Sequence, residues 1–390
     1  MSKSITVVGA GAIGLSTAWE LSQRGFDVTV IDKSVTGRGT SWAGAGILPP
    51  ANLENSFDPI DRLRGLSHQL FPEWAEKLKT DTGIDPGLQR CGGLYLAETV
   101  GEIAAMSGMT EYWQEMEIEC KQLTPDEILG QEAALADWWH KTDNAAVWHV
   151  PDEYQLRPPS YLAALKTACE KLDVTFIENT DVTDIRCRDG RAEIQHTGHW
   201  HSGDDRIVLT TGVWTGQIAS SLKLELSIVP VRGQILLLKT SRPLIRNIIN
   251  MGQRYVLARE DGHTLIGSNE EEVGFELGTT GTVLNSLMDF ATRLLPDLKS
   301  AEHVKSWSGL RPMTFDGFPM IGPVTDVENL YVAAGHYRSG LHLSAGTAVL
   351  IADMLSEVTP QIPIEAFQIR KQPGNPTTRS CTTNEQHSQT

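Results

Sequence analysis

The sequence lacks both a long apolar run and an excess of positive charge. No segment reaches the roughly 18 consecutive apolar residues that would indicate a transmembrane helix. The 33 basic and 49 acidic side chains give a net charge of −16, which argues against nucleic acid and anionic membranes as partners. The first residues, MSKSITVVGAG, hold one lysine and enter a predicted strand at once, so we expect no targeting peptide and a cytoplasmic location.

Cysteine is scarce, and its positions follow no redox or metal pattern. The five cysteines are Cys91, Cys120, Cys169, Cys187 and Cys381. None forms a CxxC pair, and an odd number without a secretory signal is typical of reduced thiols. The segment HTGHWH at 196–201 lies between turn-forming residues, and only His199 and His201 would share a strand face. We interpret it as a polar hairpin and expect no metal site.

The length of 390 residues predicts two domains rather than one compact core. Two alternating runs that meet at Asp189 and Gly190 predict a β-hairpin. The apolar runs at 233–239 and 263–269 predict further strands, and 287–298 has the periodicity of an amphipathic helix. The last segment, 371–390, has no apolar pattern and is predicted to be a disordered tail.

Residues 5–32 contain the most informative pattern of the chain. A short buried strand, Ile5–Val8, is followed by GAGAIG, an amphipathic helix with Gly25 as a plausible C-cap, and a second strand that ends in Asp32. Side chains expected to face inward on the helix are Leu15, Ala18, Trp19 and Leu21. This order of strand, glycine turn, helix, strand and acid predicts a dinucleotide-binding unit.

The three glycines of the turn have separate physical tasks. Gly9 permits the tight turn, Gly11 lets the backbone approach a pyrophosphate, and Gly14 lets the helix pack closely on the strand. The helix N-terminus offers N–H groups and a positive dipole end to the phosphates, and Asp32 can accept hydrogen bonds from ribose hydroxyls. The next segment, 34–50, is a long loop rich in Gly, Ala, Ser and Thr, which favours FAD over NAD because the flavin needs close backbone cover.

An arginine stands in an apolar segment near the C-terminus. Residues 309–322 read GLRPMTFDGFPMIG, and we expect this run to be largely buried. A buried guanidinium keeps its charge and needs an anionic partner. From the residues alone, the partner of Arg311 is either an internal carboxylate, with Asp316 nearby, or a ligand.

Several ordered motifs give the chain a family resemblance. The motifs are GAGAIG, GTSWAGAGILPP, VPVRGQ (229–234), YVLAR (255–259), LIGSNEEEVGF (265–275), GLRPMTFDGFPMIG and GHYRSGLHLSAGTA (335–348). In this order they resemble the D-amino-acid oxidase and sarcosine oxidase group of flavoproteins, and within it the glycine oxidases of thiamine biosynthesis. The resemblance extends from about residue 4 to about residue 370.

The resemblance implies an α/β and α+β fold, in which a Rossmann-like FAD-binding domain is interleaved with a substrate domain built on an antiparallel sheet. It assigns 1–85, 145–222 and 318–370 to the FAD-binding domain, and 86–144 and 223–317 to the substrate domain. Relatives are often tetramers, so a homo-oligomer is an expectation. The covalent flavin link of some members uses a C-terminal cysteine, and Cys381 lies outside the matched region, so we expect FAD to be bound non-covalently.

The resemblance also implies a set of FAD contacts. Gly9, Gly11, Ala12, Ile13 and Gly14 form the phosphate turn, Asp32 and Lys33 lie near the ribose, Thr40 and Ser41 begin the loop, Ala45, Gly46 and Ile47 press on the flavin, the Val182 backbone holds the adenine, and His336, Tyr337, Arg338, Ser339, Gly340, Leu341 and His342 line the isoalloxazine. A helix expected to start near Leu341 would direct its positive end at the flavin and favour its reduction.

For the substrate, the resemblance assigns Arg311, Arg338 and Tyr255 to the amino-acid carboxylate. It implies that Cα–H of a small amino acid delivers hydride to the flavin and that oxygen then yields hydrogen peroxide. No side chain is required as an acid or base if the amine arrives neutral. Gln253 and Glu270 depart from the family pattern, which leaves the preferred amino acid open, and we expect Glu270 to point to solvent with its acidic neighbours.

Two other functions remain open from the sequence. One is a D-amino-acid dehydrogenase that passes electrons to a quinone or carrier, although no basic amphipathic helix suggests membrane docking. The other is a non-catalytic flavin-binding module, for which Arg311, Arg338 and Tyr255 would have no common target.

Overall fold

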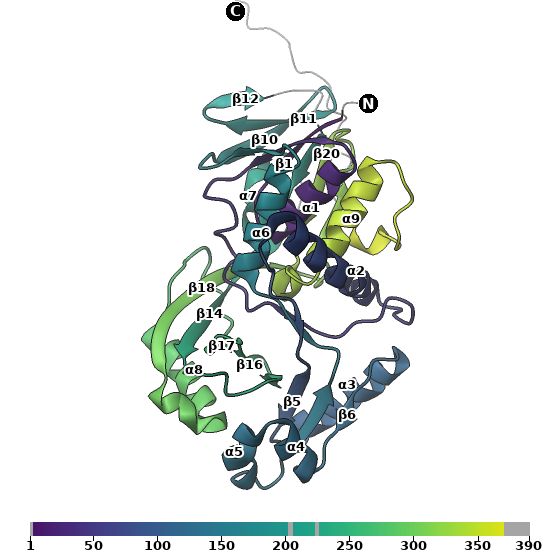
Figure 1. Cartoon of the computed structure of the whole chain (residues 1–390). Coiled ribbons are helices and arrows are strands. Elements are labelled where there is room, and N and C mark those ends of the chain that lie inside the picture. The colour runs from purple at the N-terminus through teal and green to yellow at the C-terminus, as the bar shows by residue number, and fades with distance from the viewer. Residues whose placement is uncertain (1–2, 202–205, 223–225, 370–390) are drawn as a thin grey trace, which may run out of the picture. The chain divides into compact units, whose positions relative to one another are not determined.

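The computed structural model describes residues 3–201, 206–222 and 226–369, and these form two compact units that alternate along the chain (Figure 1). The first unit comprises 1–39, 165–229 and 312–390, and the second comprises 40–164 and 230–311. The predicted disordered tail lies outside the described residues. The division into an FAD-binding domain and a substrate domain stays a prediction, because a compact unit does not show which ligand it binds.

A six-stranded sheet organises the first unit. Its order is β19 (Met320–Pro323), β20 (Leu330–Ala334), β13 (Arg206–Leu209), β1 (Ser4–Val8), β2 (Asp27–Ile31) and β9 (Thr175–Ile177). All neighbours are parallel except the antiparallel pair β19 and β20. Helix α1 (Ala12–Gln23) packs on β1 and β2, while α9 (Ser344–Leu355) packs on β19 and β20. The two helices contact each other and therefore cover the same face of the sheet.

The N-terminal β-α-β unit follows the sequence prediction closely. The four side chains predicted to face inward on α1 are all buried, because their spacing places them on the stripe that meets β1 and α9. Gly25 follows the C-cap of α1 with φ of +80°, which is the left-handed geometry that ends many helices. The predicted element order is therefore confirmed here.

A small three-stranded sheet, β10 (Val182–Arg188), β11 (Arg191–His196) and β12 (His199–His201), adds to this unit. Its predicted turn at Asp189 and Gly190 is present, and both residues have positive φ. The polar hairpin predicted at 196–201 is also present, with the His196 and His201 rings stacked at 3.7 Å. Apolar side chains of β10 and β11 share a core with β1, β2, β13 and β20.

An eight-stranded sheet organises the second unit. Its order is β18 (Glu302–Thr314), β14 (Ile228–Lys239), β17 (His263–Gly267), β16 (Arg254–Ala258), β15 (Ile248–Met251), β5 (Gly93–Ala97), β7 (Ala146–Val150) and β6 (Lys121–Gln122). From β14 to β6 the neighbours are antiparallel, apart from the parallel pair β15 and β5. A short sheet, β3 (Ile47–Leu48), β8 (Tyr154–Gln155) and β4 (Gln89–Arg90), lies in the same unit.

The two faces of the large sheet have different neighbours. On one face, α8 (Gly281–Leu294), α4 (Pro125–Gln131) and α5 (Ala136–His140) complete a hydrophobic core of the unit. The other face carries a smaller cluster around Tyr255, Leu257 and Leu265, covered by Ala45 and Ile47. The helices α2 (Pro59–Thr82) and α3 (Val100–Glu115) also belong here, while α6 (Pro158–Glu170) continues from residue 164 of the second unit into the first. The helix predicted over 287–298 is α8, which begins earlier, at Gly281.

Candidate active site

The phosphate turn of the first unit is built almost entirely from backbone. Gly9 has φ of +106°, and a Cβ on Gly14 would overlap the carbonyl oxygen of Gly9. Gly11 is the N-cap of α1, with no side-chain cap and no acidic residue in the first turn, and Ala12 and Ile13 open the helix. The positive end of α1 therefore faces the turn with no acidic side chain from the first turn of the helix against it, which fits a phosphate group.

Asp32 directly follows β2 and faces the same turn. Its Oδ2 accepts the Ala10 N–H at 2.7 Å, and its Oδ1 accepts the Ser34 N–H at 2.8 Å. A carboxylate held at this edge is chemically suited to ribose hydroxyls. Lys33 lies over the Trp214 ring, 3.2 Å from its centroid, and burial lowers the pKa of this amine. These features fit the adenosine diphosphate part of FAD.

The other candidate cofactor residues of the first unit lie on two segments. Val182 is buried at the start of β10, in the core shared with β1 and β2, and the Asp32 carbonyl accepts the N–H of nearby Thr180 at 2.9 Å. His336 begins the second segment; its Nε2 lies 3.1 Å from Thr347 Oγ1, and complete burial lowers its pKa to about 3. His336 is therefore a neutral imidazole.

The helix expected near Leu341 begins later than predicted. Residues Tyr337–Ser339 form a 3-10 turn, Tyr337 has φ of +46°, and α9 starts only at Ser344. Before α9 the backbone from Gly340 to Leu343 forms turns rather than regular helix, with Leu343 N–H bonded to Ser339 O and Ser344 N–H bonded to Leu341 O. Gly340, Leu341 and His342 thus belong to the turn that precedes α9.

In the second unit, the candidate loop Thr40–Ile47 is fixed by several bonds. Thr40 Oγ1 donates to Leu310 O at 2.9 Å, and the Gly44 N–H bonds to Ser41 O. Gly46 has φ of +80°, and its carbonyl accepts the Leu156 N–H at 2.7 Å, while Ile47 pairs with Gln155 across β3 and β8. Ala45 and Ile47 pack on the Tyr255 face of the large sheet.

A residue that sequence reasoning missed also holds this loop. Arg259 is 8 % exposed and donates to Ala45 O at 2.7 Å, to Leu156 O at 2.9 Å and to Gln155 Oε1 at 2.9 Å. Burial lowers its pKa to about 10, so the guanidinium remains charged at neutral pH. Arg259 is the last residue of the YVLAR motif. An arginine that follows an apolar strand could have indicated it, as the arginine within an apolar segment indicated Arg311.

Arg311 lies on β18 and is the last residue of the second unit. Its Nη2 donates to Ser268 Oγ at 2.7 Å, and its Nη1 donates to Asn269 O at 3.1 Å. A Cβ on Gly233 would overlap the guanidinium, so Arg311 lies directly against this glycine of β14. Both of these acceptors are neutral oxygens, and the two contacts orient the planar fork of the guanidinium.

The expectation that the segment 309–322 is largely buried is wrong. Leu310 and Ile321 are buried, but Phe315 is 97 % exposed and Asp316 is exposed. The reason is that β18 ends at Thr314 and a turn through Gly317, with φ of +79°, leads to β19. Asp316 Oδ1 accepts the Phe318 N–H at 3.1 Å within this turn.

Tyr255 and Arg311 converge on the end of the same strand. Tyr255, 9 % exposed, is the cross-strand partner of Gly267, and a Cβ on that glycine would overlap the phenol oxygen. The residues after it, Ser268 and Asn269, accept from Arg311. The segment 267–269 therefore brings together a phenol hydroxyl and a guanidinium, two groups that bind carboxylates well.

The remaining candidates, Arg338, Gln253 and Glu270, lie at exposed or half-buried positions. Arg338 belongs to the first unit, within the exposed part of the 337–339 turn. Gln253 is exposed in the turn between β15 and β16. Glu270 is half-buried. The expectation that its acidic neighbours also point to solvent is wrong for Glu271, which is ion-paired with Arg232 at 3.2 Å.

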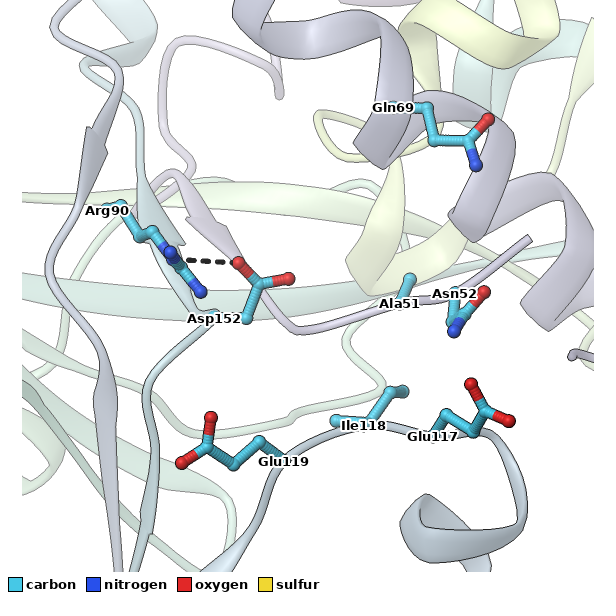
Figure 2. Close-up of a pocket in the computed structure, with 8 residues that line it drawn as sticks. All are labelled: Ala51, Asn52, Gln69, Arg90, Glu117, Ile118, Glu119 and Asp152. Carbon is cyan, nitrogen blue, oxygen red and sulfur yellow. Dashed lines mark ion pairs between the residues drawn. The ribbon is translucent and has the colours of Figure 1, made fainter. Parts of the chain in front are cut away.

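A separate polar pocket of about 330 Å³ lies elsewhere in the second unit. Its lining residues are Ala51, Asn52, Gln69, Arg90, Glu117, Ile118, Glu119 and Asp152. Figure 2 shows the Arg90 and Asp152 ion pair, with Nε 2.8 Å from Oδ1, opposite the carboxylates of Glu117 and Glu119. None of the candidate substrate or cofactor residues belongs to this lining.

The side chains and helices of residues 3–201, 206–222 and 226–369 also bear on metal binding and on membrane insertion. Within these ranges, no group of three or more His, Cys, Asp or Glu side chains is arranged to hold a metal ion. Among the helices of the same ranges, none is both long and apolar enough to cross a membrane.

Comparisons with known proteins agree on one family. A family model described as "FAD dependent oxidoreductase" matches residues 4–354. The glycine oxidase of Pseudomonas putida is 34% identical over 367 residues, which cover 93% of this chain and 97% of that protein. The crystal structure of glycine oxidase from Geobacillus kaustophilus matches with a TM-score of 0.88 at 31% identity, covering 95% of this chain and 99% of that one.

A third relative, the bifunctional protein ThiO/ThiG of Trichormus variabilis, is 29% identical over 92% of this chain, which spans 53% of that protein. The matches of nearly full length confirm the predicted fold, a parallel sheet in one unit and a largely antiparallel sheet in the other. The chain belongs to the FAD-dependent oxidoreductase family, and it is an enzyme of the glycine oxidase-like group that uses FAD to oxidise amino acids at their CH–NH₂ group.

Proposed function

We propose that the enzyme oxidises glycine, and other small amines and D-amino acids, to the imine or 2-oxo acid, with release of ammonia and hydrogen peroxide. The observation that carries the proposal is the convergence of Arg311 and Tyr255 on residues 267–269. Glycine is favoured because the full-length relatives carry that name. A role in supplying glycine imine for the thiazole of thiamine is supported by the relative named ThiO/ThiG.

The chain's own residues have two tasks in this reaction. Arg311, Arg338 and Tyr255 bind the carboxylate and thereby fix the position of Cα, and the phosphate turn with Asp32 holds the nucleotide part of FAD. Bound FAD would supply the redox chemistry, since it would take a hydride from Cα while the amine loses a proton, and molecular oxygen would then take up both as hydrogen peroxide. No side chain acts as acid or base, because orientation and charge complementarity suffice for a neutral amine.

We further propose that FAD is held without a covalent bond. Three of the described cysteines support this view, since burial raises the pKa of Cys91 to about 12 and raises the pKa of Cys120 and Cys169, which disfavours the nucleophilic thiolate. Cys381 lies outside the described residues. Acid precipitation of the pure protein should leave all yellow colour in the supernatant, and a yellow pellet would contradict the proposal.

The decisive experiment is peroxide release from the purified yellow protein in air. The panel is glycine, sarcosine, D-alanine, D-proline and L-alanine, with Arg311→Ala protein as the matched control. Peroxide from glycine at a rate comparable with the best substrate supports the proposal. Bleaching of the flavin by a D-amino acid with little peroxide would instead identify a dehydrogenase that uses a quinone or carrier, the alternative acceptor.

A further inference from the structure

Three side chains, Arg232, Gln234 and Glu271, form a polar cluster on the two segments that contact Arg311; we name it the Glu271 cluster. Arg232 Nε lies 3.2 Å from Glu271 Oε2, and Gln234 Nε2 donates to the same oxygen at 2.8 Å. The cluster is well shielded, with Arg232 7 % and Gln234 0 % exposed. The Arg232 bond, despite some burial, holds the Glu271 pKa below its usual value, so this carboxylate is ionised.

The backbone ties the same two segments together. Arg232 N–H donates to Glu271 O at 2.8 Å, and Glu271 N–H donates to Arg232 O at 3.0 Å. Gln234 N–H also donates to Asn269 Oδ1 at 2.8 Å. Residues 232–234 of β14 and residues 269–271 are therefore joined at both ends.

Arg311 rests on both of these joined segments. Its guanidinium lies against Gly233, which stands between Arg232 and Gln234, and it donates to Ser268 Oγ and Asn269 O. The surface beneath the guanidinium and the oxygens that orient it are thus fixed by the same set of bonds. A displacement of residues 269–271 would move the oxygens that accept from Arg311. The guanidinium would then turn, and it could no longer bind a carboxylate through two parallel hydrogen bonds.

We propose that Glu271, held by Arg232 and Gln234, is a positioning residue for Arg311 and thereby sets the affinity of the enzyme for the substrate carboxylate. The inference rests on the proposed role of Arg311. It has two parts: Glu271 anchors the segment that orients Arg311, and Arg232 keeps the Glu271 carboxylate paired, because an unpaired carboxylate would move toward water and displace that segment.

The test compares five variants of the FAD-loaded enzyme. Glu271→Ala removes the anchor, Arg232→Met leaves the Glu271 charge without its ion pair, and Glu271→Gln keeps an acceptor for both donors. The double variant Arg232→Met/Glu271→Gln removes both charges, and Glu272→Ala changes an exposed neighbouring acid as the control. Each is measured for kcat, KM for glycine, flavin content and the dissociation constant of acetate from its perturbation of the flavin spectrum.

We expect Glu271→Ala to raise KM and the acetate dissociation constant about tenfold, with kcat and flavin content within about twofold of wild type. Arg232→Met should raise both constants further, and the double variant should recover part of that loss. Glu271→Gln should lie near wild type, and Glu272→Ala should equal it. A purely structural role predicts lower flavin content and lower thermal stability at unchanged KM, and no recovery in the double variant.

Failure of the inference and failure of the proposed function are distinguishable. If wild type oxidises glycine but the KM and acetate constants do not change in Glu271→Ala and Arg232→Met, the positioning role is wrong while the oxidase stands. If wild type releases no peroxide with any amino acid and acetate does not perturb the flavin, the substrate assignment itself is wrong. If Glu271→Ala fails to fold, the comparison of Arg232→Met with the double variant still tests the positioning role. Equal KM values for glycine in these two variants would overturn the proposal.

Discussion

The phosphate turn of the first unit and the residues of the second unit that we propose to bind the carboxylate are built in opposite ways. The turn and its acid occupy one short stretch, Gly9 to Asp32, and its shape depends on backbone and on missing side chains. The proposed carboxylate-binding residues Tyr255 and Arg311 lie on β16 and β18, far apart in the chain, and Arg311 packs against Gly233 of β14. Steric substitutions should therefore destroy the first, whereas loss of single polar groups should weaken the second by steps.

The largest effect is expected for Gly14→Ala. The added Cβ would overlap the Gly9 carbonyl oxygen, which is backbone and cannot move aside. The strand and helix would separate, and the phosphate turn would lose its shape, so we expect nearly complete loss of FAD. The measurement is the flavin-to-protein absorbance ratio after purification.

The matched control for this substitution is Gly108→Ala. Gly108 lies within α3, and no atom lies within 4 Å of its hypothetical Cβ. Because alanine favours a helix over glycine by up to about 1 kcal/mol, this variant should keep its FAD and gain slight stability. A fully loaded Gly14→Ala protein would refute the phosphate-turn assignment.

Arg311→Ala should have the next largest effect, and its character should differ. Two charge-assisted bonds to the substrate carboxylate, each worth roughly 1.5–3 kcal/mol, would be lost, so kcat/KM should fall at least ~100-fold. The flavin should stay bound, because this arginine contacts Ser268 and Asn269 rather than the phosphate turn. Steady-state peroxide kinetics, expressed per bound flavin, measure the effect.

Arg311→Lys sharpens this prediction because it keeps the charge and loses the planar fork. It should lie between wild type and Arg311→Ala. The opposite pattern, in which Arg311→Ala loses FAD but has wild-type kinetics per flavin, would assign Arg311 to the cofactor or to structure.

The same contrast explains what the sequence could predict. A contiguous motif reveals itself by spacing, and so the strand, turn, helix and Asp32 were predicted correctly. The helix near Leu341 was placed too early because a 3-10 turn and a helix share much of their local pattern. Phe315 was expected to be buried because hydrophobicity alone does not reveal a turn at the end of a strand.

Long-range polar partners could not be predicted. Glu271 was one of three consecutive glutamates, and only the pairing of its segment with β14 shows that it is bound by Arg232 and Gln234. Arg259 likewise finds neutral acceptors from residues about 100 and 200 positions away. Register between distant strands decides such contacts, and one sequence carries little information about it.

A moderate effect of another kind is expected for Glu153, a buried carboxyl on the Tyr255 face of the large sheet. Tyr95 Oη donates to it at 2.7 Å and Asn250 Nδ2 at 3.0 Å, and Asn250 is the cross-strand partner of Tyr255. Burial raises its pKa from 4.5 to about 7. Between these two pH values the unfolded chain releases a proton that the folded chain keeps, so the free energy of unfolding falls as pH rises.

This contribution is fully present below pH 4.5 and is lost as pH passes through about 7, which amounts to on the order of 3 kcal/mol. Glu153→Gln should remove the dependence, so its urea midpoint should change less than that of wild type over this interval. The exposed Glu119→Gln variant serves as the control. Parallel pH profiles for wild type and Glu153→Gln would show that Glu153 titrates normally.

The smallest effect is expected for Tyr255→Phe, which removes one hydroxyl and keeps the ring that packs over Gly267. A net hydrogen bond of about 0.5–1.5 kcal/mol predicts a rise in KM for glycine of about three- to tenfold, with bound FAD unchanged. Tyr255 and Arg311 meet the same segment, so their effects should not be additive. The double variant Tyr255→Phe/Arg311→Ala should therefore be little worse than Arg311→Ala alone, whereas full additivity would show that the two side chains act on different parts of the substrate.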